Sequence, residues 1–550
     1  MSKNISELSG RKGLRTNLFE ELGIAAKPTG TPSEEAMNKL AREFLIGKAN
    51  VYGSATFYDF TRPENRGKKA YVCNGSACLT AGTQEAVTDK LSRHFKMDEI
   101  GNMCCLGRCH ENSAFNINGK NYSGNDIDRL DDLLGSRNKS NERYHVESLG
   151  TAILTLPFPG LDDYYTILKD ALEKSPEDIL NELQIANVRG RGGAGFPLAF
   201  KLDACRKEKS ELKFVVCNAD EGDPGAYSDR YLLEERPHSV LLGMLLAGYV
   251  SGANWGVVYI RGEYPEAIDI VERELEKLYE LGLCGENILG TNFSFDFKVI
   301  KAQGAYICGE ETALLNSIEG QRPEVRVRPP YPAQQGLFNK PTLVNNVETL
   351  ACIPYIVQHG GNAYAAIGTE KSKGTKLICL DSHFNKPGLY EVEMGTPLRT
   401  VTDVLGGGFK HPIKAMHIGG PLGGLVPVSK IDSLTVDFES FSNGGFLLGH
   451  ASVVCIPESF PLVEYIEHLF AFTAHESCGK CFPCRLGSTR GAEMLSKAQN
   501  DGYKIDRTLF NDLLETLQQG SLCALGGGLP LPVKNALHYF DEELSTYFKA

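Results

Sequence analysis

The sequence has 550 residues, too many for one ordinary hydrophobic core, so three or four domains are expected. Hydrophobic residues make up 42% of the chain and charged residues 23%, which is typical of globular proteins. The 57 basic and 69 acidic residues give a formal net charge of -12, which disfavours nucleic acid as a partner.

The most apolar stretch, residues 239–260, carries Ser251, Gly252 and Asn254 at its centre. It therefore predicts a buried helix followed by a buried strand rather than a membrane span. The N-terminal residues do not resemble a signal peptide, so we expect a cytoplasmic protein. Thiols stay reduced in that compartment, and the 16 cysteines are then packing residues, metal ligands or redox groups rather than disulfides.

The N-terminal part of the sequence predicts a helical leader followed by a small α/β domain. Residues 1–60 predict helices, with Ser33 as one helix cap. Residues 61–135 predict a strand, a helix over 83–95 and a hairpin around Asn118 and Gly119. Residues 136–154 are polar, lack apolar periodicity and are expected to form a linker.

Three further units are expected after this linker. Residues 155–372 predict a large α/β domain, in which a buried strand precedes an amphipathic helix that begins near Pro265 and ends at Gly282. Residues 373–455 are rich in glycine and short alternating strands, so they predict a small β-containing domain. Residues 456–550 predict a helical bundle around a metal site.

The metal site is indicated by Cys478, Cys481 and Cys484, which have the spacing C-x2-C-x2-C, and by the more distant Cys523. Three thiolates at this spacing can face one corner of a cubane, which a distant fourth ligand closes. The pattern therefore favours a [4Fe-4S] cluster. Zinc is a weaker alternative, because structural zinc usually takes two separated C-x2-C pairs or a Cys/His mixture. Unliganded thiols are the third possibility.

A second cysteine group stands in the N-terminal domain. Cys73 and Cys78 are followed by Cys104, Cys105 and Cys109. Two cysteine pairs on neighbouring loops can hold a [2Fe-2S] cluster, each pair binding one iron. The spacing alone leaves Cys104 and Cys105 as competing ligands, and unliganded thiols as the alternative to a cluster.

The stretch NVRGRGGAGF, residues 187–196, contains the spacing G-x-G-x-x-G. A regular dinucleotide-binding turn needs a strand directly before the glycines and an acidic residue about 20 positions later. Here the preceding residues predict a helix, and the strand-like run KFVVCNAD comes after the loop. The regular fingerprint therefore fails, although such a loop can still hold a phosphate, and a purely structural turn is the alternative. Positive charge beside it comes from Arg189, Arg191 and Lys201.

Five motifs carry a family resemblance: RGRGGAGFP, VCNADEGDPGAYSDR, YICGEETALLNSIEGQRP, KPTLVNNVET and ESCGKCFPCRLG. They occur in the order found in the flavin-bearing, NADH-oxidising subunit of respiratory complex I and its soluble relatives, which the chain resembles over residues 155–540. The N-terminal part resembles the thioredoxin-like [2Fe-2S] domain that is a separate subunit in complex I. The resemblance implies a multidomain α/β fold: a thioredoxin-like ferredoxin domain, a central non-regular Rossmann-like FMN-binding domain, a small β-grasp-like (ubiquitin-like) insert and a C-terminal helical bundle holding a [4Fe-4S] cluster.

The resemblance also implies the residues of the site. Glu221 and Glu311 would orient the reacting groups through hydrogen bonds, and Phe196 would pack against the adenine of NADH. The residues implied to contact FMN or NADH are Gly190, Arg191, Gly192, Phe196, Lys201, Asn218, Asp220, Tyr306, Gly309, Glu310, Glu311, Arg328, Tyr331, Asn345 and Asn346. The metal ligands implied by the family spacing are Cys73, Cys78, Cys105 and Cys109, with Cys478, Cys481, Cys484 and Cys523 for the second cluster.

Four positions depart from the family pattern. Ala204 stands where relatives carry a second aromatic residue for the adenine, and Asp223 replaces a glutamate. Arg328 and Tyr331 stand where lysine and phenylalanine are common. These departures leave the preference between NAD and NADP open.

The activity that the resemblance implies is hydride exchange between NAD(H) and FMN, with single electrons relayed through the iron–sulfur clusters. It requires an iron–sulfur electron-transfer subunit and a catalytic subunit as partners. The phrases DEGDPGA and RPEVRVRPPYP favour the soluble relatives, and first the diaphorase subunit of a nickel–iron, NAD-linked hydrogenase. Alternatives are the same role in a molybdenum, NAD-dependent formate dehydrogenase, a bifurcating hydrogenase or complex I. From another class, the chain could be a structural iron–sulfur scaffold with a vestigial flavin pocket.

Overall fold

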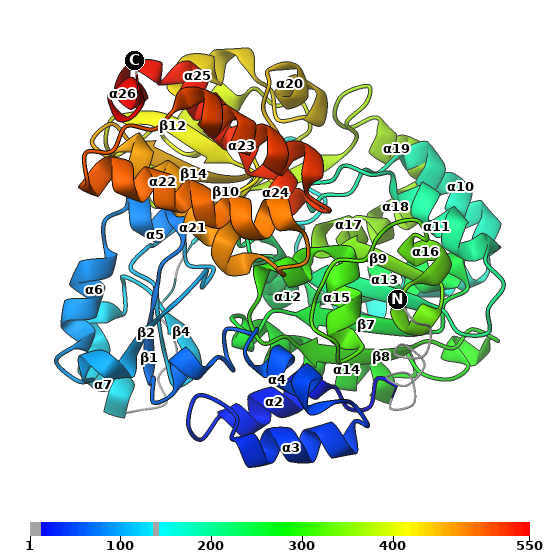
Figure 1. Cartoon of the computed structure of the whole chain (residues 1–550). Coiled ribbons are helices and arrows are strands. Elements are labelled where there is room, and N and C mark those ends of the chain that lie inside the picture. The colour runs from blue at the N-terminus through cyan, green and yellow to red at the C-terminus, as the bar shows by residue number, and fades with distance from the viewer. Residues whose placement is uncertain (1–12, 136–141, 143, 550) are drawn as a thin grey trace.

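The computed structural model describes residues 13–135, 142 and 144–549 (Figure 1). The described chain begins with a layer of helices beneath the central domain: α2 (Leu18–Ala26), α3 (Glu34–Glu43) and α4 (Lys48–Ala55). Ser33 caps α3, because its Oγ atom accepts the N–H of Ala36 at 3.1 Å. Asn17 Nδ2 donates to the carbonyl of Ile318 at 2.6 Å and ties the layer to the central domain. The described part of the leader is therefore helical as expected, and residues 1–12 lie outside it.

The N-terminal domain has a four-stranded sheet in the order β2-β1-β3-β4. β1 runs parallel to β2 and antiparallel to β3. Asn118 (φ 53°) and Gly119 (φ 76°) form the turn of the β3–β4 hairpin, as the sequence predicts, because both positions need a left-handed backbone. Its elements are β1 (Ala70–Cys73), α5 (Ser76–Thr80), α6 (Gln84–Leu91), β2 (Ile100–Met103), β3 (Phe115–Ile117), β4 (Lys120–Tyr122) and α7 (Leu130–Gly135).

The central domain is a parallel sheet in the order β8-β7-β6-β9, with helices packed around it (Figure 1). Its strands are β6 (Phe214–Ala219), β7 (Trp255–Ile260), β8 (Asp296–Lys301) and β9 (Thr342–Asn346). Its helices are α8 (Leu161–Tyr164), α9 (Thr166–Leu172), α10 (Pro176–Ala186), α11 (Leu198–Lys207), α12 (Ser228–Glu235), α13 (Pro237–Ser251), α14 (Pro265–Glu280), α15 (Glu311–Ile318), α16 (Pro332–Gln335), α17 (Val347–Ala351), α18 (Ile353–His359) and α19 (Gly361–Ala365).

Two sequence predictions are confirmed in this domain. The glycine loop follows α10 and precedes α11, while the first strand, β6, comes only afterwards, so the loop is not a regular dinucleotide-binding turn. The apolar stretch 239–260 forms the buried helix α13 and the buried strand β7. Among the described residues no helix is long and apolar enough to cross a membrane.

The small β-containing domain has a six-stranded sheet in the order β13-β12-β14-β10-β11-β5. β10 pairs antiparallel with β11 and parallel with β14, so that β10 and β14 lie at its centre. Its elements are β10 (Thr375–Leu380), β11 (Gly388–Glu393), β12 (Ile413–Ile418), β13 (Gly424–Pro427), α20 (Phe438–Asn443) and β14 (Ser452–Pro457).

The edge strand β5 (His145–Leu149) differs from the sequence expectation, because it lies within the expected linker 136–154. It pairs in parallel with β11 over five residues. Its side chains are exposed or half-buried, which explains why no apolar periodicity marks it in the sequence. Residues 136–141 and 143 of the expected linker lie outside the described chain.

A buried carboxylate fixes the segment that follows β5. Glu391 of β11 accepts hydrogen bonds from the backbone N–H groups of Ile153, Leu154 and Thr155 at 2.9 to 3.0 Å. It also accepts the hydroxyl of Thr375 at 2.6 Å. These bonds join the small domain to the start of the central domain.

The C-terminal region is a bundle of six helices that packs on the small domain (Figure 1). Asn535 Oδ1 accepts the N–H of Leu425 at 3.2 Å and forms part of this contact. His468 Nε2 lies 3.1 Å from Ser76 Oγ, so α21 also contacts the N-terminal domain. The helices are α21 (Leu462–Glu476), α22 (Ser488–Asn500), α23 (Arg507–Gly520), α24 (Ala524–Gly528), α25 (Pro530–Tyr539) and α26 (Asp541–Leu544).

Replacing Glu391 by alanine should destabilise the chain by about 3 kcal/mol, because three backbone N–H groups lose their acceptor. Chemical denaturation followed by circular dichroism measures the change. The control is Glu147→Ala on β5, whose half-exposed side chain should contribute less than about 0.5 kcal/mol. Equal unfolding midpoints for the two variants would refute this role of Glu391.

Candidate functional site

The candidate site lies at the carboxyl ends of β6 and β9, which are neighbours in the parallel sheet. Asn218 at the end of β6 pairs in register with Asn346 at the end of β9. Ligands of open parallel sheets bind beyond this edge, where the loops diverge. The structure therefore brings two predicted motifs, NADEG and VNNVE, to the same place.

The glycine loop packs directly against the end of β9. A Cβ atom on Gly192 would lie 2.9 Å from Cβ of Asn346, so a side chain at position 192 would force the loop away. The backbone N–H of Arg191 donates to Thr349 Oγ1 at 2.9 Å, and that of Gly190 donates to the Phe196 carbonyl at 2.8 Å. The loop is thus closed on itself and anchored to α17.

Several buried polar atoms at this site have no hydrogen-bond partner within the described chain. They are Nδ2 of Asn345, Nε and Nη1 of Arg191 and Oδ2 of Asp220. Buried polar atoms are normally paired, so each unpaired one is a candidate contact for a bound group. A phosphate with a polar ring system, as in FMN, fits this set of donors and acceptors. Burial also raises the pKa of Asp220 well above its usual value.

Charged side chains line the neighbouring segment. Lys201 Nζ donates to the Val344 carbonyl at 3.1 Å and lies 3.5 Å from Glu311 Oε2. Arg328 Nη1 contacts Glu311 Oε1 at 2.7 Å. Glu310 instead caps α15, since its carboxylate accepts the N–H groups of Thr312 and Ala313 at 2.9 Å.

The turn Tyr306–Gly309 (η5) lies beside the end of β6. Asn218 Nδ2 donates to the Gly309 carbonyl at 2.7 Å. The Tyr306 hydroxyl donates to Asp223 Oδ1 at 2.6 Å, and its backbone N–H donates to Glu476 Oε2 at 2.8 Å. The turn is therefore held on one side by residues 220–227, here called the acidic loop, and on the other side by α21.

Glu221 is committed to helix capping. Its carboxylate accepts the backbone N–H groups of Asp229 and Arg230 at 2.9 and 3.1 Å and the hydroxyl of Ser228 at 3.1 Å. These groups form the first turn of α12, where a carboxylate is stabilised by unpaired N–H groups. Glu221 thus fixes the acidic loop against α12.

The predicted adenine contact has an aromatic neighbour that sequence reasoning missed. Phe196 is 45% exposed, and its ring centroid lies 5.5 Å from that of Phe200, which is 66% exposed. Phe200 occupies an ordinary apolar position of α11 in the sequence, so only its exposure distinguishes it. Tyr331 stays at the periphery, where it is exposed and its N–H bonds to Gln334 Oε1 at 3.2 Å.

Among the N-terminal cysteines, Cys105 and Cys104 have different surroundings. Cys105 Sγ lies 3.4 Å from Cys109 Sγ. Contacts with the thiols of Cys105 and Cys78, together with burial, raise the pKa of Cys73. Cys104 is half-buried and instead lines a cavity of about 840 Å³ between this domain, the leader and α21. The group Cys73, Cys78, Cys105 and Cys109 is therefore brought together, and it fits a [2Fe-2S] cluster.

Three hydrogen bonds attach the cysteine loop 104–109 to the central domain. The backbone N–H of Gly225, in the acidic loop, donates to Cys109 Sγ at 3.2 Å. Arg261 donates to the carbonyls of Glu221 and Cys104 at 2.5 and 3.2 Å. Arg230 donates to the Gly107 carbonyl at 2.8 Å. The acidic loop therefore contacts both the Tyr306 turn and the N-terminal thiols.

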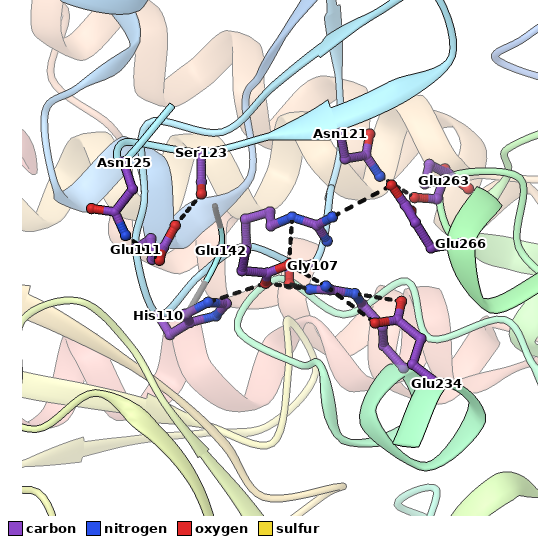
Figure 2. Close-up of polar contacts among 12 residues, drawn as sticks. Gly107, His110, Glu111, Asn121, Ser123, Asn125, Glu142, Glu234, Glu263 and Glu266 are labelled. Carbon is purple, nitrogen blue, oxygen red and sulfur yellow. Dashed lines mark hydrogen bonds and ion pairs between the residues drawn. The ribbon is translucent and has the colours of Figure 1, made fainter. Parts of the chain in front are cut away.

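Glu142 lies in a buried network of charges beside this loop (Figure 2). Arg108 Nε and His110 Nε2 each lie 3.1 Å from its carboxylate, and Arg230 pairs with it from α12. Burial alone would raise the pKa of Glu142, but Arg230 and Arg108 hold it well below its usual range. The network joins the N-terminal domain to the central domain.

The C-terminal cysteines form the second group of candidate metal ligands. Cys478, Cys481 and Cys484 follow α21, and Cys523 immediately precedes α24. All four pack in one apolar cluster together with Leu525. Burial raises the pKa of Cys484 to about 11, so an apolar gathering of thiols disfavours free thiolates and fits a cationic iron–sulfur core.

Three family models match the chain. A thioredoxin-like [2Fe-2S] ferredoxin matches residues 5–138, the Nuo51 FMN-binding domain matches 183–355, and the NADH-ubiquinone oxidoreductase-F iron-sulfur binding region matches 464–547. These matches confirm the expected multidomain fold and the expected cofactors: FMN, a [4Fe-4S] cluster and a [2Fe-2S] cluster.

Similar proteins agree with these matches. The chain is 40% identical to the NADP-reducing hydrogenase subunit HndC of Solidesulfovibrio fructosivorans, over 70% of this chain and 80% of that protein. It is 32% identical to the NAD-reducing hydrogenase HoxS subunit alpha of Cupriavidus necator, over 96% and 91%. A crystal structure of an NAD+-reducing [NiFe]-hydrogenase in the air-oxidized state superposes with a TM-score of 0.84 at 28% identity, covering 98% and 95% of the two chains.

Replacing Cys105 by alanine should remove the [2Fe-2S] electron paramagnetic resonance signal and about two irons per chain. Replacing Cys104 by alanine is the matched control and should leave both unchanged, because its thiol faces the cavity. Iron analysis and spectra of the dithionite-reduced proteins measure the result. Loss of the signal in the Cys104 variant, with retention in the Cys105 variant, would reverse the assignment.

Proposed function

The chain belongs to the family of flavin- and iron–sulfur-bearing NADH-oxidising subunits of complex I and NAD-linked hydrogenases, and from this premise we propose that it is a diaphorase subunit. It exchanges hydride between NAD(H) and FMN and relays single electrons through iron–sulfur clusters. FMN, when bound, supplies the conversion between two-electron and one-electron transfer. The observation that carries the proposal is the unpaired buried polar atoms of the glycine loop, β9 and the acidic loop, between which we place the flavin cleft.

The residues of the cleft would bind and orient the flavin. Asn345 Nδ2 and the Nε and Nη1 atoms of Arg191 are buried donors without a partner in the described chain, while Arg191 Nη2 donates to the Tyr364 hydroxyl at 3.0 Å. Lys201 adds positive charge. Gly192 allows the close approach of backbone to ligand. Glu311 is held by Lys201 and Arg328, which supports an orienting role rather than proton abstraction.

The nicotinamide nucleotide would enter beside the exposed aromatic pair. Phe196 and Phe200 are both exposed and meet edge to face, so each offers an aromatic surface to an adenine ring. Phe200 offers a second aromatic surface although Ala204 replaces the one that relatives carry. We propose NAD(H) as the substrate, because the relative aligned over 96% of this chain is named for reducing NAD.

The proposed domains divide the cofactors among them. Residues 61–135 would hold the [2Fe-2S] cluster, 155–372 the flavin and 456–550 the [4Fe-4S] cluster. Residues 373–455 would pack between them, with β5 as an added strand.

The proposed partners are an iron–sulfur electron-transfer subunit and a nickel–iron hydrogenase subunit, in a cytoplasmic complex. The names of the relatives and the likeness to a hydrogenase structure support this choice. A formate dehydrogenase or complex I would use the same cleft chemistry.

Anaerobic addition of NADH should bleach the flavin absorbance of the purified full chain and support dye reduction.

Asn345→Leu should weaken FMN binding about tenfold, because a buried hydrogen-bond donor is lost. Flavin fluorescence in a dilution series measures the affinity. Asn362→Leu, at an exposed position of α19, is the control. A wild-type chain that holds both clusters but neither retains FMN nor oxidises NADH would instead be an iron–sulfur scaffold.

A further inference from the structure

His450 reaches the cleft from the small β-containing domain, in the turn before β14. Its side chain is only 10% exposed. The Nε2 atom lies 2.6 Å from Asp223 Oδ2, and Nδ1 accepts the backbone N–H of Ser452 at 3.3 Å. Each ring nitrogen therefore faces a polar atom, which favours one orientation of the imidazole.

Asp223 lies between His450 and Tyr306. Its Oδ1 atom accepts the Tyr306 hydroxyl at 2.6 Å, while Oδ2 faces His450. A second loop of the small domain presses on the same carboxylate, because a Cβ atom on Gly420 would lie 2.5 Å from Asp223 Oδ1. The small domain thus holds this side chain from two sides.

The charges around His450 and Asp223 explain why the Asp223 carboxylate needs the imidazole beside it. Glu221 is a second carboxylate near His450, and Lys376 of β10 is a cation facing the same region. Burial alone would lower the pKa of His450, but Asp223 and then Glu221 raise it above its usual value. A carboxylate in this setting is costly unless a positive or hydrogen-bonding partner accompanies it.

The contacts continue from Asp223 into the flavin cleft. Tyr306 begins the turn that ends at Gly309, and the Gly309 carbonyl accepts Asn218 Nδ2 at the end of β6. On the opposite side, a Cβ atom on Gly193 would lie 3.8 Å from the backbone nitrogen of His450. His450 is therefore placed where the glycine loop, the acidic loop and the Tyr306 turn meet.

We propose that His450 is a positioning residue for NADH oxidation, which acts by fixing Asp223 and, through it, the hydroxyl of Tyr306. The small domain would then complete the cleft rather than merely connect its neighbours. The proposal rests on the diaphorase function proposed above. It concerns the orientation of the Tyr306 turn and not a proton transfer.

The test compares two variants of the full chain at equal FMN content. His450→Leu removes the partner of Asp223 and should lower kcat for NADH-dependent dye reduction about tenfold, with KM changed less than about twofold. His450→Gln keeps an N–H donor near the Nε2 position and should retain about half of the wild-type kcat or more. His411→Leu, at an exposed position of the same domain, should match the wild type.

A double-mutant cycle with Tyr306→Phe tests the route of the effect. If His450 acts through Tyr306, the two substitutions together should lower kcat little more than the stronger one alone. Fully additive effects would overturn the proposal. A wild-type kcat in His450→Leu would also overturn it. Equal losses of kcat or of FMN in the Leu and Gln variants would overturn it too, because they would assign the ring a packing role. Failure of the wild-type chain to oxidise NADH would instead refute the diaphorase function.

Discussion

The backbone N–H of Gly225 donates to Cys109 Sγ. Gly225 belongs to the acidic loop, so the position of this loop constrains the whole cleft. Residues 220–227 contact the Tyr306 turn through Asp223 and the N-terminal cysteines through Gly225. Arg261 strengthens this arrangement by binding carbonyls of both segments, Glu221 and Cys104. A small shift of the loop would therefore change the cleft and the cluster ligands together. Hydrogen bonds to ligand sulfurs are also one of the means by which proteins tune cluster potentials.

The loop keeps its position because its carboxylates have different partners. Glu221 caps α12, and Asp223 is divided between Tyr306 and His450. Asp220 differs from both, since its Oδ2 atom lacks a hydrogen-bond partner among the described residues and its pKa is raised by burial. Two carboxylates thus stabilise the scaffold, while the third is buried without a hydrogen-bond partner at Oδ2 among the described residues.

The sequence predicted what depends on local patterns or on specific spacing. The helix before the glycine loop and the strand after it follow from apolar periodicity, and the hairpin at Asn118 follows from turn chemistry.

Tertiary contacts could not be predicted from the sequence. The strand β5 is an edge strand whose partner is more than 200 residues away, and Phe200 resembles any apolar helix position. His450 carries no motif, because its neighbour Asp223 is supplied by another domain. Spacing also could not choose between Cys104 and Cys105, whose side chains diverge only in the folded loop.

Electrons from NADH should reach both cysteine groups through the flavin. The most direct measurement adds NADH anaerobically to the full chain holding both clusters, with and without FMN, and follows the clusters by electron paramagnetic resonance. Signals of reduced clusters should appear only when FMN is present and should return when FMN is restored. Equally fast cluster reduction by NADH in the FMN-free chain would contradict this route.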